Sequence, residues 1–142
     1  MATRPFSLPP PPGRYVADLP NGAAIVVNGQ KYKAIGHNNP NGGGSENAFG
    51  HDFKSDDGKY GWGLKLCCGD SDGDGFTNGH ELGDPCCVWK KGAVPANTTG
   101  LSHPGISSST PANVKPGCVA TVCKAFLAEA ATPALRGGAA SA

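Results

Sequence analysis

The feature that most constrains this chain is a run of twelve residues, 70–81, with the sequence DSDGDGFTNGHE. Oxygen-bearing groups stand at every position from which a calcium loop of this length takes its ligands. A glycine at the sixth position permits the sharp turn that brings those oxygens to one centre. The expected ligands, in chain order, are Asp70, Asp72, Asp74, the carbonyl of Phe76, Asn78 (directly or through a water) and Glu81.

The alternative interpretation of this run is an acidic, glycine-rich surface turn. Four carboxylates crowded into twelve residues would repel one another at contact distance if no cation lay between them. An all-oxygen ligand set suits calcium, whereas zinc and copper prefer histidine and cysteine. The sequence therefore predicts calcium as the cofactor.

The flanks of the loop do not predict the long helices of a calcium sensor. Residues 60–69 include three glycines, which make a long helix unfavourable. Downstream, Pro85 disfavours helical backbone at Asp84, so any helix there ends after about one turn. The chain has no second loop of this pattern. We expect one isolated structural site, of the kind that binds calcium at about 0.1–1 mM in extracellular modules.

Two pairs of adjacent cysteines bracket the loop, and two further cysteines follow. Adjacent pairs lack the Cys-x2-Cys spacing of zinc sites, so disulfides in an oxidising compartment are favoured over zinc or free thiols. Bridges from residues 67–68 to residues 86–87 would close about 20 residues around the calcium site, each stabilising by about 3 kcal/mol. The remaining two could pair with each other or with the leftover central cysteines. The six are Cys67, Cys68, Cys86, Cys87, Cys118 and Cys123.

The composition indicates a loop-rich domain with a thin core. Of 142 residues, 22 are glycine and 13 proline, and 38% are hydrophobic, so covalent or metal cross-links would help stability. The expected organisation has four parts. These are a Pro-rich extended arm at 1–14, a calcium- and disulfide-containing domain at 15–106, a C-terminal extension with a helix at 107–132, and a flexible tail at 133–142.

The expected secondary structure consists of short elements. An Asn-Gly pair at 28–29 between two β-prone runs predicts a hairpin, with two or three short antiparallel strands within 15–35. Ser45 is the expected N-cap of a short helix that places Phe49 and Phe53 on one face. An apolar stripe within 119–130 predicts another helix. The fold class is therefore α+β, small and loop-rich.

Charge and hydropathy limit the partners and the location. The formal net charge is +1 with no basic run, and no long apolar segment exists, so neither nucleic acid nor a membrane span is expected. The N-terminus shows no signal peptide. The cysteines nevertheless indicate an extracellular location or another oxidising compartment such as an organelle lumen, reached after removal of a targeting segment or by another route. Asn97 begins a glycosylation sequon.

Four segments together resemble the temptin family. They are residues 36–44, 47–53, 72–89 and, more weakly, 102–105. Temptins are secreted, cysteine-bridged, calcium-loop proteins. The resemblance implies a bridge between one of residues 67–68 and one of residues 86–87, and a non-enzymatic role through protein contacts. The chain departs from the family pattern in two ways, because residues 1–66 contain no cysteine and the segment after 106 does not align.

The leading functional hypothesis is a non-catalytic, calcium-binding, disulfide-bonded module that mediates protein–protein recognition or scaffolding, and not an enzyme. A structural subunit of a large extracellular or organelle-lumen assembly is an alternative, favoured by chain ends that would be disordered when free. The alternative from a different class is a metalloenzyme that uses His37 and His103. The spacing of these two with His51 and His80 matches no ligand motif.

Overall fold

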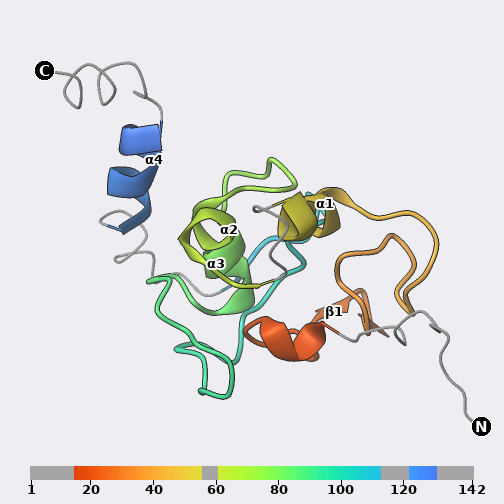
Figure 1. The fold of residues 1–142 in the computed structure, drawn as a ribbon. Helices are drawn as coiled ribbons and strands as arrows, with labels where there is room; N and C mark the ends of the chain where they lie inside the picture. Colours follow the sequence, from red (N-terminus) through yellow and green to blue (C-terminus); the bar gives the residue numbers. More distant parts are fainter. Residues whose placement is uncertain (1–14, 56–60, 113–121, 131–142) are drawn as a thin grey trace, which may run out of the picture.

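A computed structural model describes residues 15–55, 61–112 and 122–130 (Figure 1). The expected arm at 1–14, the expected tail at 133–142 and Cys118 lie outside these residues. The α+β, loop-rich class is confirmed, since the described elements are one two-stranded sheet and short helices. In chain order they are η1 (Val16–Asp18), β1 (Val26–Val27), β2 (Gln30–Lys31), α1 (Ala48–Ser55), α2 (Leu64–Cys68), α3 (Asn78–Leu82) and α4 (Lys124–Ala130).

The predicted hairpin is present and its register follows from its turn. Val26 faces Lys31 and Val27 faces Gln30 in an antiparallel pair. Asn28 and Gly29 both have positive φ, at 51° and 80°, which matches the twist of a two-residue hairpin turn. No third strand joins the pair within the described residues. The β-prone segment before it forms the 3₁₀ turn η1 instead, because it satisfies its own backbone through local i to i+3 hydrogen bonds.

Helix α1 begins later than the sequence predicts. Asn47 is the cap, because its side-chain oxygen accepts a hydrogen bond from the backbone N–H of Gly50 at 2.9 Å. The prediction of Ser45 as the N-cap is wrong: its hydroxyl accepts a hydrogen bond from the side chain of Asn38 at 2.8 Å. Phe49 and Phe53 do share the buried face of the helix, as their spacing predicts.

The core lies between α1, α2, α3 and the segments around the hairpin. Seven buried apolar side chains form it: Leu19, Ile25, Ile35, Phe49, Phe53, Leu66 and Leu82. Helix α3 ends at Gly83, whose φ of 87° requires a residue without a β-carbon. A β-carbon at Gly83 would also lie 2.2 Å from the carbonyl oxygen of Asn97, so the loop around residue 97 packs directly on the end of α3.

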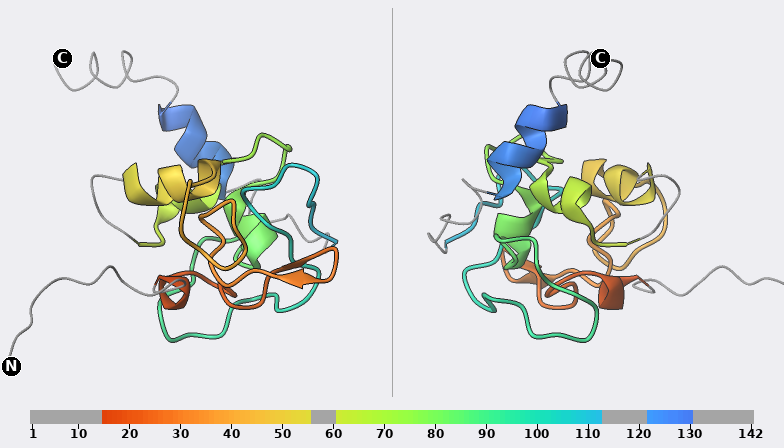
Figure 2. Two further views of the ribbon diagram at one scale, coloured as in Figure 1. Left: turned by 90° about the vertical axis from the view of Figure 1, so that its right-hand side faces the viewer. Right: turned by 60° about the vertical axis from the view of Figure 1, so that its left-hand side comes forward.

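Helix α4 lies at the edge of the domain, on the side away from the hairpin (Figures 1 and 2). The helix that it packs against most is α2. Among the described residues, no helix is long and apolar enough to span a membrane.

Candidate metal site

The calcium-loop sequence folds into a tight turn around its carboxylates. Carboxylate oxygens of Asp70, Asp72 and Asp74 lie within 4.8 Å of one another. Backbone N–H groups point inward, since Gly75 N donates to Asp70 Oδ2 at 2.8 Å and Phe76 N donates to Asp74 Oδ1 at 2.9 Å. The positive φ of Gly75, 93°, permits this curvature. The loop is therefore preorganised to present oxygen atoms to a common centre.

Glu81 extends from α3 toward this cluster and is fully buried. One carboxylate oxygen, Oε1, accepts a hydrogen bond from the hydroxyl of Ser102 at 2.8 Å. The other oxygen, Oε2, is buried and has no hydrogen-bond partner. The same is true of Oδ2 of Asp72 and Oδ2 of Asp74. Buried carboxylate oxygens normally have partners, because an unpaired one loses its hydration without compensation. Three such oxygens, on side chains whose charges act on one another, fit a bound cation.

The pKa values of two of these carboxylates are raised. Burial raises the pKa of Glu81 to about 9; the hydrogen bond from Ser102 opposes the rise, and the charges of Asp72 and Asp74 add to it. Burial, followed by the charge of Asp74, raises the pKa of Asp72 to about 7. Like charges held together without a counter-charge favour the protonated forms. A divalent cation would hold the same carboxylates ionised, and calcium suits an all-oxygen donor set.

The structure gives the side chain of Asn78 a role that the sequence did not reveal. Its nitrogen donates to the carbonyl of Leu66 at 2.8 Å and to the hydroxyl of Ser71 at 2.9 Å. Its oxygen accepts from Ser71 N at 3.3 Å. These bonds fasten the loop to the end of α2. The ligand roles of Asn78 and of the Phe76 carbonyl remain predictions.

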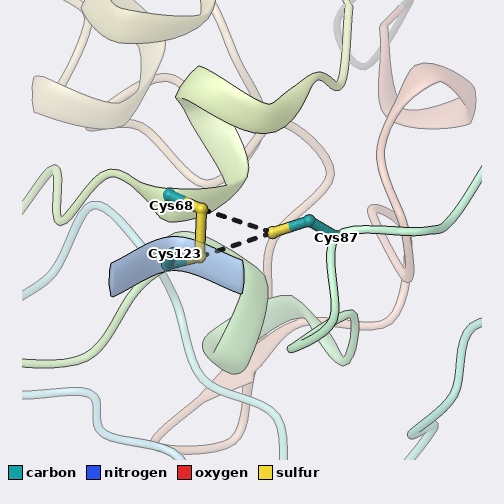
Figure 3. Close-up of side chains that lie close together, drawn as sticks. All are labelled: Cys68, Cys87 and Cys123. Atoms are coloured by element: carbon teal, nitrogen blue, oxygen red, sulfur yellow. Dashed lines mark hydrogen bonds between the residues drawn. A yellow bond between two sulfur atoms is a disulfide. The ribbon is translucent and has the colours of Figure 1, made fainter. Parts of the chain in front are cut away.

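Two disulfides adjoin the loop in the chain, and Figure 3 shows one of them, between Cys68 and Cys123, beside the sulfur of Cys87. Cys67 bonds to Cys87, across 20 residues, and thereby joins α2 to the segment after α3. Cys68 bonds to Cys123 at the start of the C-terminal helix. Cys86 is also disulfide-bonded, and its partner lies outside the described residues. The loop is therefore held at both ends by the same covalent cross-link.

Asp84, which belongs to none of the sites predicted from the sequence, is a buried carboxylate that organises the chain beside the site. Its Oδ2 accepts from the indole N–H of Trp62 at 2.7 Å and from the backbone N–H of Trp89 at 3.0 Å. Its Oδ1 accepts from the backbone N–H of Val88 at 3.0 Å. The available signal was an acidic residue outside the loop pattern, placed between a helix-ending glycine and Pro85. Asp84 thereby joins the indole of Trp62, which packs against the core, to the backbone of the segment at 88–89.

The two histidines of the alternative hypothesis each bury a ring nitrogen without a hydrogen-bond partner, Nδ1 of His37 and Nε2 of His103. His103 is fully buried, and its Nδ1 accepts a hydrogen bond from Gly105 N at 2.9 Å. The hydrogen of the neutral ring is therefore on Nε2. A histidine that binds a metal through one ring nitrogen normally donates a hydrogen bond from the other, whereas Nδ1 of His103 accepts one. Within the part of the chain that the structure describes, no group of three candidate metal-binding side chains includes a histidine. A metal site that uses His37 and His103 therefore remains a prediction.

The buried His103 should make the protein less stable in mild acid, by about 2 kcal/mol between pH 7 and pH 5. Burial lowers the pKa of His103 from its ordinary value of 6.5 to about 4. Below pH 6.5 the histidine binds a proton in the unfolded chain but stays neutral in the folded chain. Its contribution to the free energy of unfolding is therefore fully present above pH 6.5 and is lost as the pH falls toward 4.

Urea unfolding at the two pH values measures this loss. The His103→Asn variant keeps a short acceptor for Gly105 but cannot titrate, so its stability should change less over the same interval. The difference between the two proteins isolates His103 from the carboxylates. Equal changes for both proteins would contradict the expectation.

The sequon residue Asn97 lies on the loop that packs against α3. Its backbone N–H donates to the carbonyl of Gly83 at 3.0 Å, and its carbonyl accepts from the side chain of Asn21 at 2.7 Å. The residue itself is partly exposed, and Thr98 and Thr99 after it are exposed. Attachment of a glycan at Asn97 remains a prediction.

The comparisons with known proteins agree with the motifs. A family model described as Temptin C-terminal matches residues 12–106. Temptin of Aplysia californica is 49% identical to the chain over 100 residues, which cover 68% of this chain and 78% of that protein. No solved structure matches the chain significantly.

Proposed function

The chain belongs to the temptin family, and from this premise we propose that it is a secreted, non-catalytic recognition module whose binding surface calcium and disulfides hold in shape. The disulfides and the family membership indicate an extracellular, oxidising location. The observation that carries the calcium part of the proposal is that buried oxygens of Asp72, Asp74 and Glu81 have no hydrogen-bond partner while the charges of the two aspartates act on Glu81. Asp70, Asp72, Asp74 and Glu81 would hold the ion.

Calcium would act by joining segments that are distant in the chain. Glu81 already contacts the segment after residue 100 twice, because its backbone carbonyl accepts from Ser102 N at 3.0 Å and its side chain accepts from Ser102 Oγ. An ion bound to Glu81 and to the aspartates would therefore connect the loop, α3 and the segment at 102–105. Neutralised carboxylates would replace mutual repulsion with attraction to one centre.

The glycine- and asparagine-rich loop at 36–44 is our candidate for the contact surface. Asn38, Asn39 and Asn41 are exposed and offer amide donors and acceptors. The loop is closed at its base by Asn38 N donating to the carbonyl of Ser45 at 3.1 Å, so little ordering entropy would remain to be lost on binding. Such a surface suits a protein partner, either a free one or a neighbouring subunit of a larger assembly.

Thermal unfolding in the presence of calcium tests this proposal. Stabilisation by a ligand that binds only the folded state follows RT ln(1 + [Ca]/Kd), which is about 2.7 kcal/mol at 100 times Kd. The melting temperature should therefore rise by several degrees as calcium is added to the oxidised protein. Magnesium at the same ionic strength is the control, because it demands a smaller octahedral site and should stabilise less. Identical melting curves in calcium and in chelator would rule the proposal out.

A further inference from the structure

The two described disulfides are in direct contact with each other. Cys87 Sγ lies 3.7 Å from Cys68 Sγ and 3.7 Å from Cys123 Sγ, although it is bonded to Cys67 (Figure 3). Thiol–disulfide exchange needs a thiolate that can reach a disulfide sulfur, and this contact would leave a released Cys87 within reach of the neighbouring bond. Bridges that serve only as staples do not need this contact.

We propose that this cluster is a thiol–disulfide exchange site, in which Cys87 passes from Cys67 to Cys68 when a dithiol reductant is present. One thiolate of the dithiol attacks Cys87 Sγ and expels the Cys67 thiolate, which takes up a proton. The second thiol of the reductant closes on the first and expels the Cys87 thiolate. Cys87 then attacks Cys68 Sγ and expels the Cys123 thiolate, which takes up the second proton. The dithiol loses two electrons and two protons, and the protein gains two thiols.

Cys87 is the sulfur that the reductant would attack first, because it is the least buried of the four. Cys67, Cys68 and Cys123 are at most 2% exposed, whereas Cys87 is partly exposed. Cys87 also has a φ of 58°, in the left-handed region that a residue with a β-carbon avoids. Its equal distances to the two neighbouring sulfurs place it beside their bond, off the line of attack. Cleavage from Cys67 frees the side-chain rotation that brings it into line.

The geometry around Cys67 favours its remaining reduced after the exchange. Its sulfur lies 3.3 Å from the carbonyl oxygen of Asp84. A thiol at this position would donate a weak hydrogen bond to that oxygen, so the buried S–H group would have an acceptor. The leaving group is therefore accommodated as a neutral thiol where it stands.

Loop lengths favour Cys68 over Cys123 as the new partner. The bond between Cys68 and Cys123 closes a separation of 55 residues, whereas Cys87 is separated from Cys68 by 19 residues and from Cys123 by 36. Closing the shortest of these loops costs the least chain entropy. The exchange would also remove the covalent tether between α4 and α2, the helix that α4 contacts.

Limited reduction of the full-length protein tests the proposal. One equivalent of dithiothreitol, followed by alkylation with iodoacetamide and disulfide mapping by tandem mass spectrometry, should give two labels per molecule, on Cys67 and Cys123. The same molecules should contain a bond between Cys68 and Cys87. Labels on any other pair, including Cys67 with Cys87, would overturn the exchange.

A substitution provides an independent route to the same state. The Cys67→Ser variant keeps a donor for the Asp84 carbonyl and leaves Cys87 without its original partner. It should be isolated with Cys68 bonded to Cys87 and with Cys123 as the free thiol. Retention of the bond between Cys68 and Cys123, with Cys87 free, would overturn the proposal. If this variant fails to fold, the limited reduction of the natural protein still decides the matter.

Discussion

The Glu81→Gln variant is expected to lose calcium-dependent stabilisation and to be more stable than the natural protein when calcium is absent. Glutamine keeps an oxygen for the hydroxyl of Ser102, which lies 2.8 Å from Glu81 Oε1. It removes the buried charge whose pKa is raised to about 9. Because the folded form of such an acid binds a proton that the unfolded form releases above pH 4.5, ionisation destabilises the natural protein as the pH rises toward 9.

Unfolding free energies in chelator and in calcium measure both effects. At 100 times the natural Kd, the natural protein should gain about 2.7 kcal/mol from calcium, and Glu81→Gln less than about 0.5 kcal/mol. In chelator at pH 7.5 the variant should be more stable by about 1–3 kcal/mol. The matched control is Glu46→Gln, since Glu46 is paired with Lys54 at the surface. Full calcium stabilisation in Glu81→Gln would show that the ion does not bind this carboxylate.

Replacement of Asp84 by alanine is expected to cost about 3–5 kcal/mol of unfolding free energy. The substitution leaves three donors without their acceptor, namely the indole N–H of Trp62 and the backbone N–H groups of Val88 and Trp89. A buried donor left unsatisfied costs about 1–3 kcal/mol, and because these three donors are partly buried, each should contribute toward the lower end. Denaturant unfolding followed by tryptophan fluorescence measures the loss, because Asp84 contacts both tryptophans of the chain.

The control for this prediction is Asp18→Ala. Asp18 pairs with Lys91 at 2.9 Å, but the lysine side chain is 66% exposed, so the pair should contribute less than about 1 kcal/mol. The loss of unfolding free energy in the conservative Asp84→Asn variant should lie between those of Asp84→Ala and Asp18→Ala, because asparagine keeps one acceptor oxygen. A loss for Asp84→Ala no larger than that for Asp18→Ala would mean that solvent reaches the three donors.

Local patterns in this chain predict local structure well. The Asn-Gly pair at 28–29 determines a hairpin because few residues accept two successive positive φ angles. The acidic segment at 70–81 forms a tight turn because its glycines accept positive φ angles within it. Phe49 and Phe53 share a face because helix geometry alone places them there. In each case the physics acts within a few residues.

Features that depend on contacts between distant segments could not be predicted in the same way. The pairing of Cys68 with Cys123 depends on where α4 is placed, which no local rule specifies. Asn78 has the side chain of a ligand, but its nearest donors and acceptors belong to Ser71 and α2. The N-cap of α1 is Asn47 and not the predicted Ser45, because the side chain of Asn38 donates a hydrogen bond to the serine hydroxyl from across the loop.

The side chain of Asn21 has a consequence for how the chain folds. Its amide nitrogen donates to the carbonyls of Leu82 and Asn97, at 2.8 and 2.7 Å, across separations of 61 and 76 residues. Contacts of such high sequence separation form only after much of the chain has been brought together, which slows folding. The hairpin and the acidic loop can order early, whereas closure of the domain by Asn21 belongs to the late stage. The slow step of folding should therefore lie in bringing the N-terminal segment onto the end of α3.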